Sequence, residues 1–153
     1  MSSTILAAGA VVWRKNEKKK IEVVIIHRPK YDDWTFPKGK TEIGEPLISC
    51  AHREVLEETN IESAFGPYLG EVEYSTADGK KKVSFWSAKA IKETEFNPNS
   101  EVDQIKWVEV TKVKDLLTLD TDKKILEKFI KIELDTKPFI LLRHAKAITR
   151  DEW

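Results

Sequence analysis

The sequence predicts a domain of the α/β class, because runs with the apolar pattern of strands are interspersed with two segments of helical periodicity. The chain has 153 residues, about one domain's worth, and this length is enough to bury a sizeable core. Hydrophobic residues make up 41% of the chain and aromatic residues 9%, without a long Gly, Pro or Ser tract. This composition excludes disordered and collagen-like proteins.

The first half of the chain predicts two strands, a loop and a helix. Residues Ile5–Trp13 and Ile21–Ile26 are apolar or β-branched and are separated by a charged turn, which is typical of two connected strands. Two prolines bracket a loop over residues 29–37. Residues Pro46–Asn60 have helical periodicity, with proline in the first turn and asparagine at the end.

The second half predicts a hairpin, a short strand, a second helix and a last strand. Alternating residues flank the turn Asp78-Gly79, as expected for a hairpin. A later segment has apolar residues spaced along one helical face. In order, the expected elements are strands Tyr68–Ser75, Lys82–Ala90 and Ile105–Val110, helix Thr121–Glu133 and strand Phe139–Leu142.

Charge and cysteine content restrict the partners. Lys plus Arg and Asp plus Glu each number 26, so there is no overall attraction for nucleic acid or an anionic membrane. Any polyanion must therefore bind locally. Cys50 is the single cysteine, and we find neither a signal segment nor a membrane-spanning apolar run. We expect a cytoplasmic protein without a membrane or a stable nucleic-acid partner, and the oligomeric state stays open.

The helix expected at Pro46–Asn60 places carboxylates next to its own apolar stripe. At about 100° per residue, Glu54 and Glu58 lie on or beside this stripe and Glu57 lies at its flank. The stripe consists of Leu47, Ile48, Cys50, Ala51 and Val55. Carboxylates that face a core require a positive charge. Arg53 supplies only one, so the grouping favours a hard divalent cation such as Mg²⁺ or Mn²⁺.

Residues 39–61, GKTEIGEPLISCAHREVLEETNI, resemble the Nudix box, G-x5-E-x7-R-E-U-x-E-E-x-G-U with U aliphatic. One position departs: Asn60 stands where the box has its last glycine, and asparagine tolerates the left-handed conformation of a helix end. Eight positions match at the family spacing, namely Gly39, Glu45, Arg53, Glu54, Val55, Glu57, Glu58 and Ile61.

The resemblance covers about Thr4–Leu134 and implies the family's α/β/α sandwich with a mixed central sheet, in a domain of residues 1–136. It also implies a Mg²⁺-dependent pyrophosphohydrolase in which Glu54, Glu57 and Glu58 bind metal. The Gly39 carbonyl is a candidate further ligand, and Glu57 or Glu58 is a candidate base. Arg53 and Glu45 would form a structural ion pair. Many family members use an acidic residue from a later loop, for which Glu101 is the candidate here.

The segment before the box indicates the substrate. Residues 34–40, WTFPKGK, resemble diadenosine tetraphosphate hydrolases, diphosphoinositol polyphosphate hydrolases and bacterial MutT-type enzymes. Lys38 and Lys40 are candidates to meet a polyphosphate as point charges. The candidates to extend a basic rim are His27, Arg28, Lys81 and Lys82. The candidates to stack on a base are Tyr31, Trp34, Phe85 and Trp86.

Residues 140–147, ILLRHAKA, resemble the opening of a histidine phosphatase domain, which predicts a truncated second domain over residues 137–153 with a silent His144. A bacterial MutT-type group carries such a domain after its Nudix domain, and this group implies nucleoside polyphosphate substrates, either 8-oxo-guanine nucleotides or diadenosine polyphosphates. The alternatives are a diphosphoinositol polyphosphate hydrolase and a catalytically idle nucleotide- or RNA-binding module.

Overall fold

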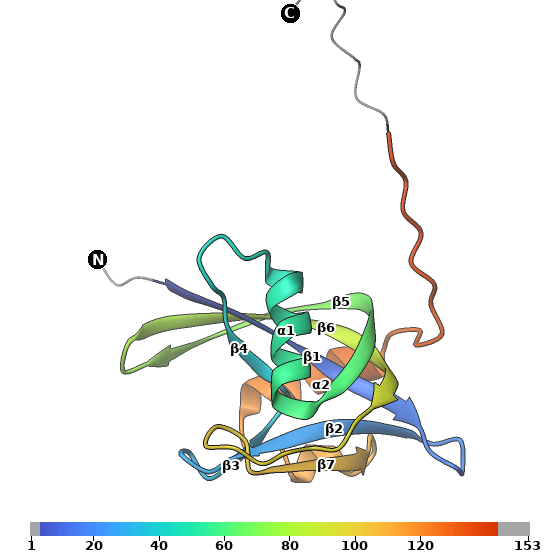
Figure 1. The fold of residues 1–153 in the computed structure, drawn as a ribbon, viewed down its shortest axis with the longest axis horizontal. Helices are drawn as coiled ribbons and strands as arrows, with labels where there is room; N and C mark the ends of the chain where they lie inside the picture. Colours follow the sequence, from blue (N-terminus) through green and yellow to red (C-terminus); the bar gives the residue numbers. More distant parts are fainter. Residues whose placement is uncertain (1–3, 144–153) are drawn as a thin grey trace, which may run out of the picture.

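The computed structural model describes residues 4–143, and Figure 1 shows a mixed sheet with helices on both of its faces. Within this range seven strands form one sheet, in the order β3-β2-β1-β6-β5, with β4 also pairing with β1 and β7 also pairing with β2. Their bounds are β1 Thr4–Lys15, β2 Ile21–Arg28, β3 Asp33–Thr35, β4 Lys38–Lys40, β5 Ile61–Thr76, β6 Gly79–Glu93 and β7 Gln104–Glu109. The expected α/β class with a mixed sheet is confirmed.

Strand β1 is the centre of the sheet, because it is paired along both edges. It runs parallel to β6 and antiparallel to β2 and β4. Its side chains alternate between two buried layers, with Val11 and Trp13 in one and Ala10 and Val12 in the other. A strand that is buried on both faces reads as a continuous apolar run, which explains the sequence pattern of residues 5–13.

Helix α1, Leu47–Thr59, packs on one face of the sheet against β1. Cys50, Ala51 and Val55 are its buried apolar residues. Pro46 precedes the first turn in an extended conformation, and Asn60 ends the helix with φ 55°, so its N–H bonds the Leu56 carbonyl. Asparagine thus adopts the left-handed conformation for which the box uses glycine.

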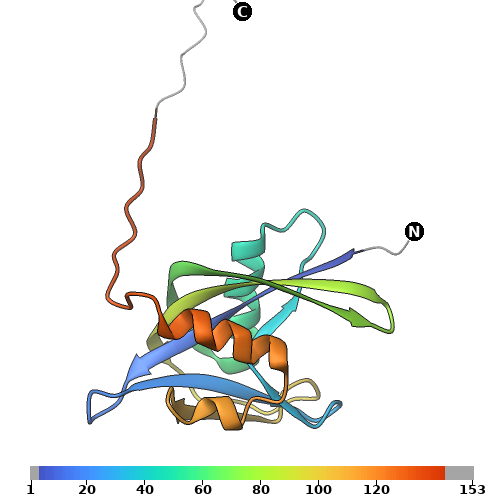
Figure 2. The same cartoon turned by 180° about the vertical axis from the view of Figure 1, so that it is seen from behind.

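Helix α2, Asp120–Ile130, covers the opposite face, as the reverse view shows (Figure 2). Ile125, Leu126 and Phe129 pack into the cluster that contains Trp13 and Phe85. A short 3₁₀ turn, Val113–Asp115, precedes it. The helix ends three residues before the expected Glu133, although Ile132 still contacts the core. No helix within residues 4–143 combines the length and apolarity that a membrane crossing requires.

Three expectations for the elements require correction. Residues 33–35 and 38–40 are short strands, β3 and β4, because β2 and β1 offer them open edges. Strand β5 begins at Ile61, directly after α1, where its first residues pair with the end of β6.

The strand expected at Phe139–Leu142 is wrong. These side chains are 76 to 90% exposed, and no described strand lies beside them, so their backbone groups have no ladder to join. His144 lies outside the described residues.

Candidate active site

A cleft of about 410 Å³ lies where β4, the glutamate side of α1 and two loops meet. The first loop, residues 29–32, joins β2 to β3, and the second, residues 94–103, joins β6 to β7. Acidic and basic residues line this cleft together. Its lining consists of Arg28, Lys30, Tyr31, Lys38, Gly39, Lys40, Glu54, Glu58, Ser100 and Glu101.

Helix α1 delivers Glu54 and Glu58 to the cleft, one turn apart on the side of the helix that faces the sheet. Glu58 is buried, and its Oε2 accepts a hydrogen bond of 2.8 Å from the Lys38 backbone N–H. Burial raises the pKa of Glu58 to about 8, against the opposing effect of Lys38. Burial also raises the pKa of Glu54, and the nearby carboxylates of Glu57 and Glu101 add to the rise. These carboxyl groups therefore lie in a position that favours a cation.

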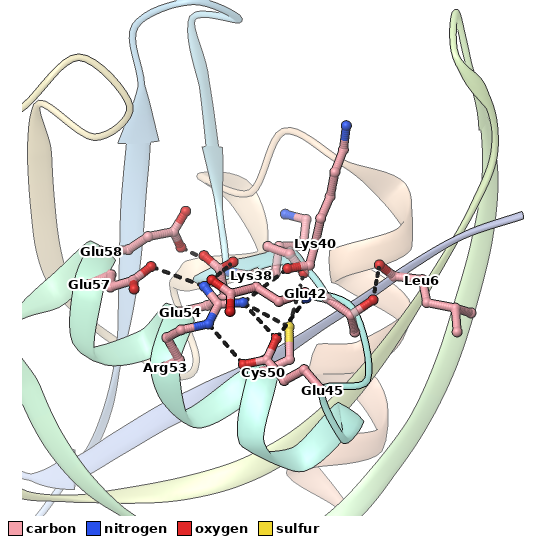
Figure 3. A network of polar contacts seen from close by, with 12 residues as sticks. Leu6, Lys38, Lys40, Glu42, Glu45, Cys50, Arg53, Glu54, Glu57 and Glu58 are labelled. Carbon is pink, nitrogen blue, oxygen red and sulfur yellow. Dashed lines mark hydrogen bonds and ion pairs between the residues drawn. The ribbon is translucent and has the colours of Figure 1, made fainter.

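The guanidinium of Arg53 joins three box glutamates to one another and to the loop before the helix (Figure 3). It bonds both oxygens of Glu45 at 2.8 Å, and it donates to Glu54 at 2.9 Å, Glu57 at 3.1 Å and the Lys40 carbonyl at 3.0 Å. The pKa of Glu45 falls to about 2, chiefly because of the hydrogen bonds from Arg53. The expected ion pair between Arg53 and Glu45 is present, and it ties the loop over residues 41–46 to α1.

Glycine is required at position 39 by close approach rather than by backbone conformation. A Cβ built on Gly39 would lie 2.0 Å from the carboxylate of Glu54. The Gly39 carbonyl accepts a weak hydrogen bond from the Cys50 thiol at 3.5 Å. Strand β4 can thus run directly past the glutamate because position 39 has no side chain.

Gly39→Ala should displace the Glu54 carboxylate while leaving the fold largely intact, because the obstructing atoms are the end of a flexible side chain. We expect an apparent Mn²⁺ affinity lower by roughly tenfold, the size expected when support of a ligand is lost, and an unfolding midpoint close to wild type. Metal titration and denaturant unfolding would measure both. Gly44→Ala is a control of another kind, since no atom lies near its Cβ but its φ is +76°. That variant should lose stability without losing metal affinity.

Lys38 lines the cleft, but its ammonium group lies in the protein interior rather than on an exposed loop. Its Nζ is 3.7 Å from Asp122 Oδ2, and both side chains are almost completely buried. Asp122, in the first turn of α2, also accepts a hydrogen bond from the Phe36 N–H at 3.1 Å. Burial lowers the pKa of Lys38 and raises that of Asp122. Nothing in the sequence pattern of α2 predicted this buried pair, because an acidic residue in a first turn is usually exposed.

The other expected binding residues divide into two groups. Arg28 lies over the Tyr31 ring at 4.5 Å and bonds both oxygens of Asp33, so both expected residues meet at the cleft beside Lys40. Lys82 does not join them, because it pairs with Glu71 at 2.7 Å elsewhere on the hairpin.

The adjacent Lys81 lies nearer to the site. Its pKa falls to about 8 through burial and the positive charges of Lys38, Arg28 and Lys40. Both lysines were candidates for the basic rim, and alternation along β6 lets only one of them face the site.

The donor set suits a hard divalent cation, although it does not form a closed cluster. Glu54, Glu58 and Glu101 line one cleft, and because burial raises the pKa of Glu54 and Glu58, a bound cation would favour their ionised forms. Glu57 is 58% exposed and points to Arg53. Across residues 4–143, no three acidic, His or Cys side chains converge closely enough to hold an ion as they stand. A metal would therefore require side-chain rotation.

Comparison with known proteins agrees with this geometry. The chain is 40% identical to the 8-oxo-(d)GTP phosphatase of Mycolicibacterium smegmatis over 98% of its own length, and it spans about half (49%) of that protein. It is 33% identical to the asymmetrical bis(5'-nucleosyl)-tetraphosphatase of Caenorhabditis elegans, over 69% of this chain and 80% of the relative.

A crystal structure of a C. elegans Ap4A hydrolase binary complex superposes with a TM-score of 0.74 at 27% identity, covering 82% of this chain and 95% of that one. The family model of the NUDIX domain matches residues 4–129. This match covers most of the chain and includes the helix, the loops and the carboxylates of the cleft. The chain therefore belongs to the NUDIX domain family.

Proposed function

We propose that this chain hydrolyses a phosphoanhydride bond of a nucleoside polyphosphate, and that the substrate is an 8-oxo-guanine nucleoside triphosphate or a diadenosine polyphosphate. The observation that carries the proposal is the cleft that Glu54, Glu58 and Glu101 line together with Arg28 and Lys40. An acidic wall suits metal ions, and a basic wall suits phosphate oxygens. The names of the mycobacterial and nematode relatives support these two substrate classes.

Mg²⁺, with Mn²⁺ as the alternative, is the proposed cofactor. Glu54, Glu58 and Glu101 would hold it, joined by Glu57 if that side chain turns from Arg53, and the Gly39 carbonyl remains a candidate ligand. When bound, the metal would neutralise phosphate oxygens and activate a water molecule. In the metal-free protein burial raises the pKa of Glu58 to about 8, and a bound cation would favour its ionised form. Glu57 or Glu58 is the proposed base.

The protein side chains would supply position and charge for the phosphate chain. Arg28 is held in place by its hydrogen bonds to Asp33. Lys40 follows Gly39 in β4, whereas Lys38, which precedes Gly39, has its ammonium group in the interior. Lys81, whose pKa is lowered in part by Lys38, Arg28 and Lys40, would add a positive charge near the cleft, and the exposed ring of Tyr31 is available for stacking on a base. The buried Lys38 would act mainly through its backbone N–H, which orients Glu58.

A substrate panel tests the proposal. Purified protein would be incubated with 8-oxo-dGTP, dGTP, diadenosine tetraphosphate and a diphosphoinositol phosphate, each with Mg²⁺ and with excess chelator, and the products separated by ion-exchange chromatography. We expect Mg²⁺-dependent product from 8-oxo-dGTP or diadenosine tetraphosphate. Preferential turnover of the inositol substrate would support the first alternative. Tight RNA binding without any product would support a catalytically idle module and contradict the proposal.

The histidine-phosphatase-like identity of residues 137–153 and the cytoplasmic location stay predictions. Phosphohistidine formation at His144 would contradict the prediction that this residue is silent.

A further inference from the structure

His27 lies between the two loops that line the cleft, residues 29–32 and residues 94–103. It is next to last in β2, where it pairs in register with Trp34 of β3 and Gln104 of β7. The first loop ends at Asp32, directly before β3, and the second ends at Asp103, directly before β7. Both aspartates bond the imidazole, Asp103 to Nδ1 at 2.6 Å and Asp32 to Nε2 at 3.0 Å.

The chemistry of these two bonds depends on protonation. An ionised carboxylate only accepts hydrogen bonds, and a neutral imidazole has a single N–H donor. Both bonds can therefore form at once only when the ring is the doubly protonated imidazolium. The two carboxylates raise the pKa of His27, the hydrogen bond to Asp103 having the largest effect, and the side chain is only 13% exposed.

The other groups packed around the ring within residues 4–143 do not oppose this arrangement. The neighbouring Arg28 is held by Asp33 through two hydrogen bonds. From β3 the ring meets the indole of Trp34, 5.1 Å away between centroids, and Lys106 of β7 lies over the same indole. From β7 its register partner is the uncharged Gln104. The charges that face His27 directly are thus Asp32 and Asp103.

We propose that His27, as an imidazolium, is a positioning residue that fastens the Glu101 loop to the Tyr31 loop across the cleft. The Asp103 N–H bonds the His27 carbonyl at 3.2 Å, so side chain and backbone attach the second loop at the same point, two residues after Glu101. An Asn99 turn, in which Oδ1 accepts from the Glu101 and Val102 N–H groups, connects Glu101 to the residues next to it in this short segment.

The sign of the pH dependence follows from the raised pKa. The fastening is complete below the pKa of an unfolded histidine, about 6.5, and is lost as pH rises through the higher folded value. Above it, the ring keeps one carboxylate partner and presents a lone pair to the other. The Glu101 loop is then less firmly attached.

Asp103→Asn separates this mechanism from a general structural role. An amide can donate as well as accept, so the asparagine introduced at this position can donate to an unprotonated Nδ1 while Nε2–H still bonds Asp32. The variant should therefore keep the loop attached at high pH. Asp32→Asn provides the same test at the other nitrogen, and it keeps a residue type that tolerates the φ of 48° at this position.

Amide hydrogen exchange by NMR on the full chain is the first measurement. The wild-type Asp103 amide should lose about tenfold in protection factor, the size expected for one charge-assisted hydrogen bond, as the His27 ring deprotonates. In Asp103→Asn the protection at residue 103 should stay constant. An unchanged wild-type protection factor, or an equal loss in the variant, would overturn the inference.

Mn²⁺ binding followed by electron paramagnetic resonance is the second measurement. This part rests on the proposed function, because it takes Glu101 as a metal ligand. Comparing wild type with Asp103→Asn at the same pH cancels the protonation of the other ligands. The affinity ratio of variant to wild type should rise about tenfold between about pH 6 and about pH 8.5, whereas the ratio for His52→Gln, on the exposed side of α1, should stay constant.

The two measurements distinguish the possible failures, since neither needs turnover. A constant ratio for Asp103→Asn, with the exchange change intact, would show that the fastening exists but does not position Glu101, which overturns the proposal. Absence of hydrolysis in the substrate panel, with both pH effects observed, would contradict the proposed function and leave His27 as a positioning residue of a metal site.

Discussion

Glu58→Gln is expected to reduce Mg²⁺-dependent hydrolysis by roughly 100-fold or more, the effect of removing one group that stabilises charge in a transition state. The introduced glutamine keeps the shape of the side chain and can still accept the hydrogen bond from the Lys38 N–H, so the fold should persist. It removes the negative charge that faces the cleft. Steady-state rates with saturating substrate and a series of Mg²⁺ concentrations would measure the loss.

The same substitution should stabilise the metal-free protein at neutral and alkaline pH. The folded pKa of Glu58 is about 8, whereas the unfolded value is about 4.3. Between these values the folded state binds more protons than the unfolded state, so wild-type stability falls as pH rises through this range. Glutamine has no such dependence, and the variant should be more stable by on the order of a few kcal/mol near pH 8.

Urea unfolding in the presence of chelator, over a series of pH values, would measure this difference. Glu62→Gln is the matched control, because Glu62 is a half-exposed residue of β5 paired with Lys92 on the surface. It should change neither hydrolysis nor the pH dependence of stability. Wild-type turnover in Glu58→Gln would exclude Glu58 from the reaction. An unchanged stability profile would show that its carboxyl group is already ionised at neutral pH.

Asp122→Ala is expected to lower the free energy of unfolding by roughly 3–5 kcal/mol, the cost of removing one partner from a buried ion pair. The substitution leaves the Lys38 ammonium group in the interior without its carboxylate, and it removes the acceptor of the Phe36 N–H. Because Phe36 lies just before β4 and Lys38 is its first residue, the loss should also reach the site. We expect slower hydrolysis as well as lower stability, measured on the same preparation.

A double variant tests whether the destabilisation arises from the stranded charge. Lys38→Met with Asp122→Asn removes both charges, while the introduced asparagine keeps an oxygen for the Phe36 N–H. The double variant should be more stable than Asp122→Ala, because replacing both members of a buried pair costs less than removing one. If the double variant is as unstable as Asp122→Ala, the unpaired Lys38 charge and the lost hydrogen bond to Phe36 do not explain the destabilisation. The attraction between Lys38 and Asp122 would then be what stabilises this region.

The box helix is the part of the site that could be predicted closely. Its limits, its left-handed end at Asn60 and the inward placement of Glu54 and Glu58 agree with the structure, because helical periodicity is a local property of the chain. Among the residues of the predicted apolar stripe, only Ile48 was placed wrongly, because it is 47% exposed. A stripe of constant width along the helix assumes that the sheet covers every turn equally, whereas the first turn of α1 is covered less.

The binding residues were harder to predict, because they depend on contacts between distant segments. Whether Lys81 or Lys82 faces the cleft follows from the register of β6 on β1 and β5, which local alternation leaves undecided. Lys38 looks like an exposed loop lysine in sequence, yet β4 pairs with β1 and turns its side chain inward to Asp122. The strand expected at Phe139–Leu142 is wrong for a related reason: an apolar run becomes a strand only beside a partner.

The sequence by itself determined the α/β class, the family and the grouping of carboxylates on one helix, since these depend on spacing along a short segment. The tertiary structure alone decided which charges meet. It placed Asp122 under Lys38, 84 positions apart by their numbers, and it set Asp32 and Asp103 on opposite nitrogens of His27. Such pairs form because strand pairing and helix packing bring together residues that no local pattern connects.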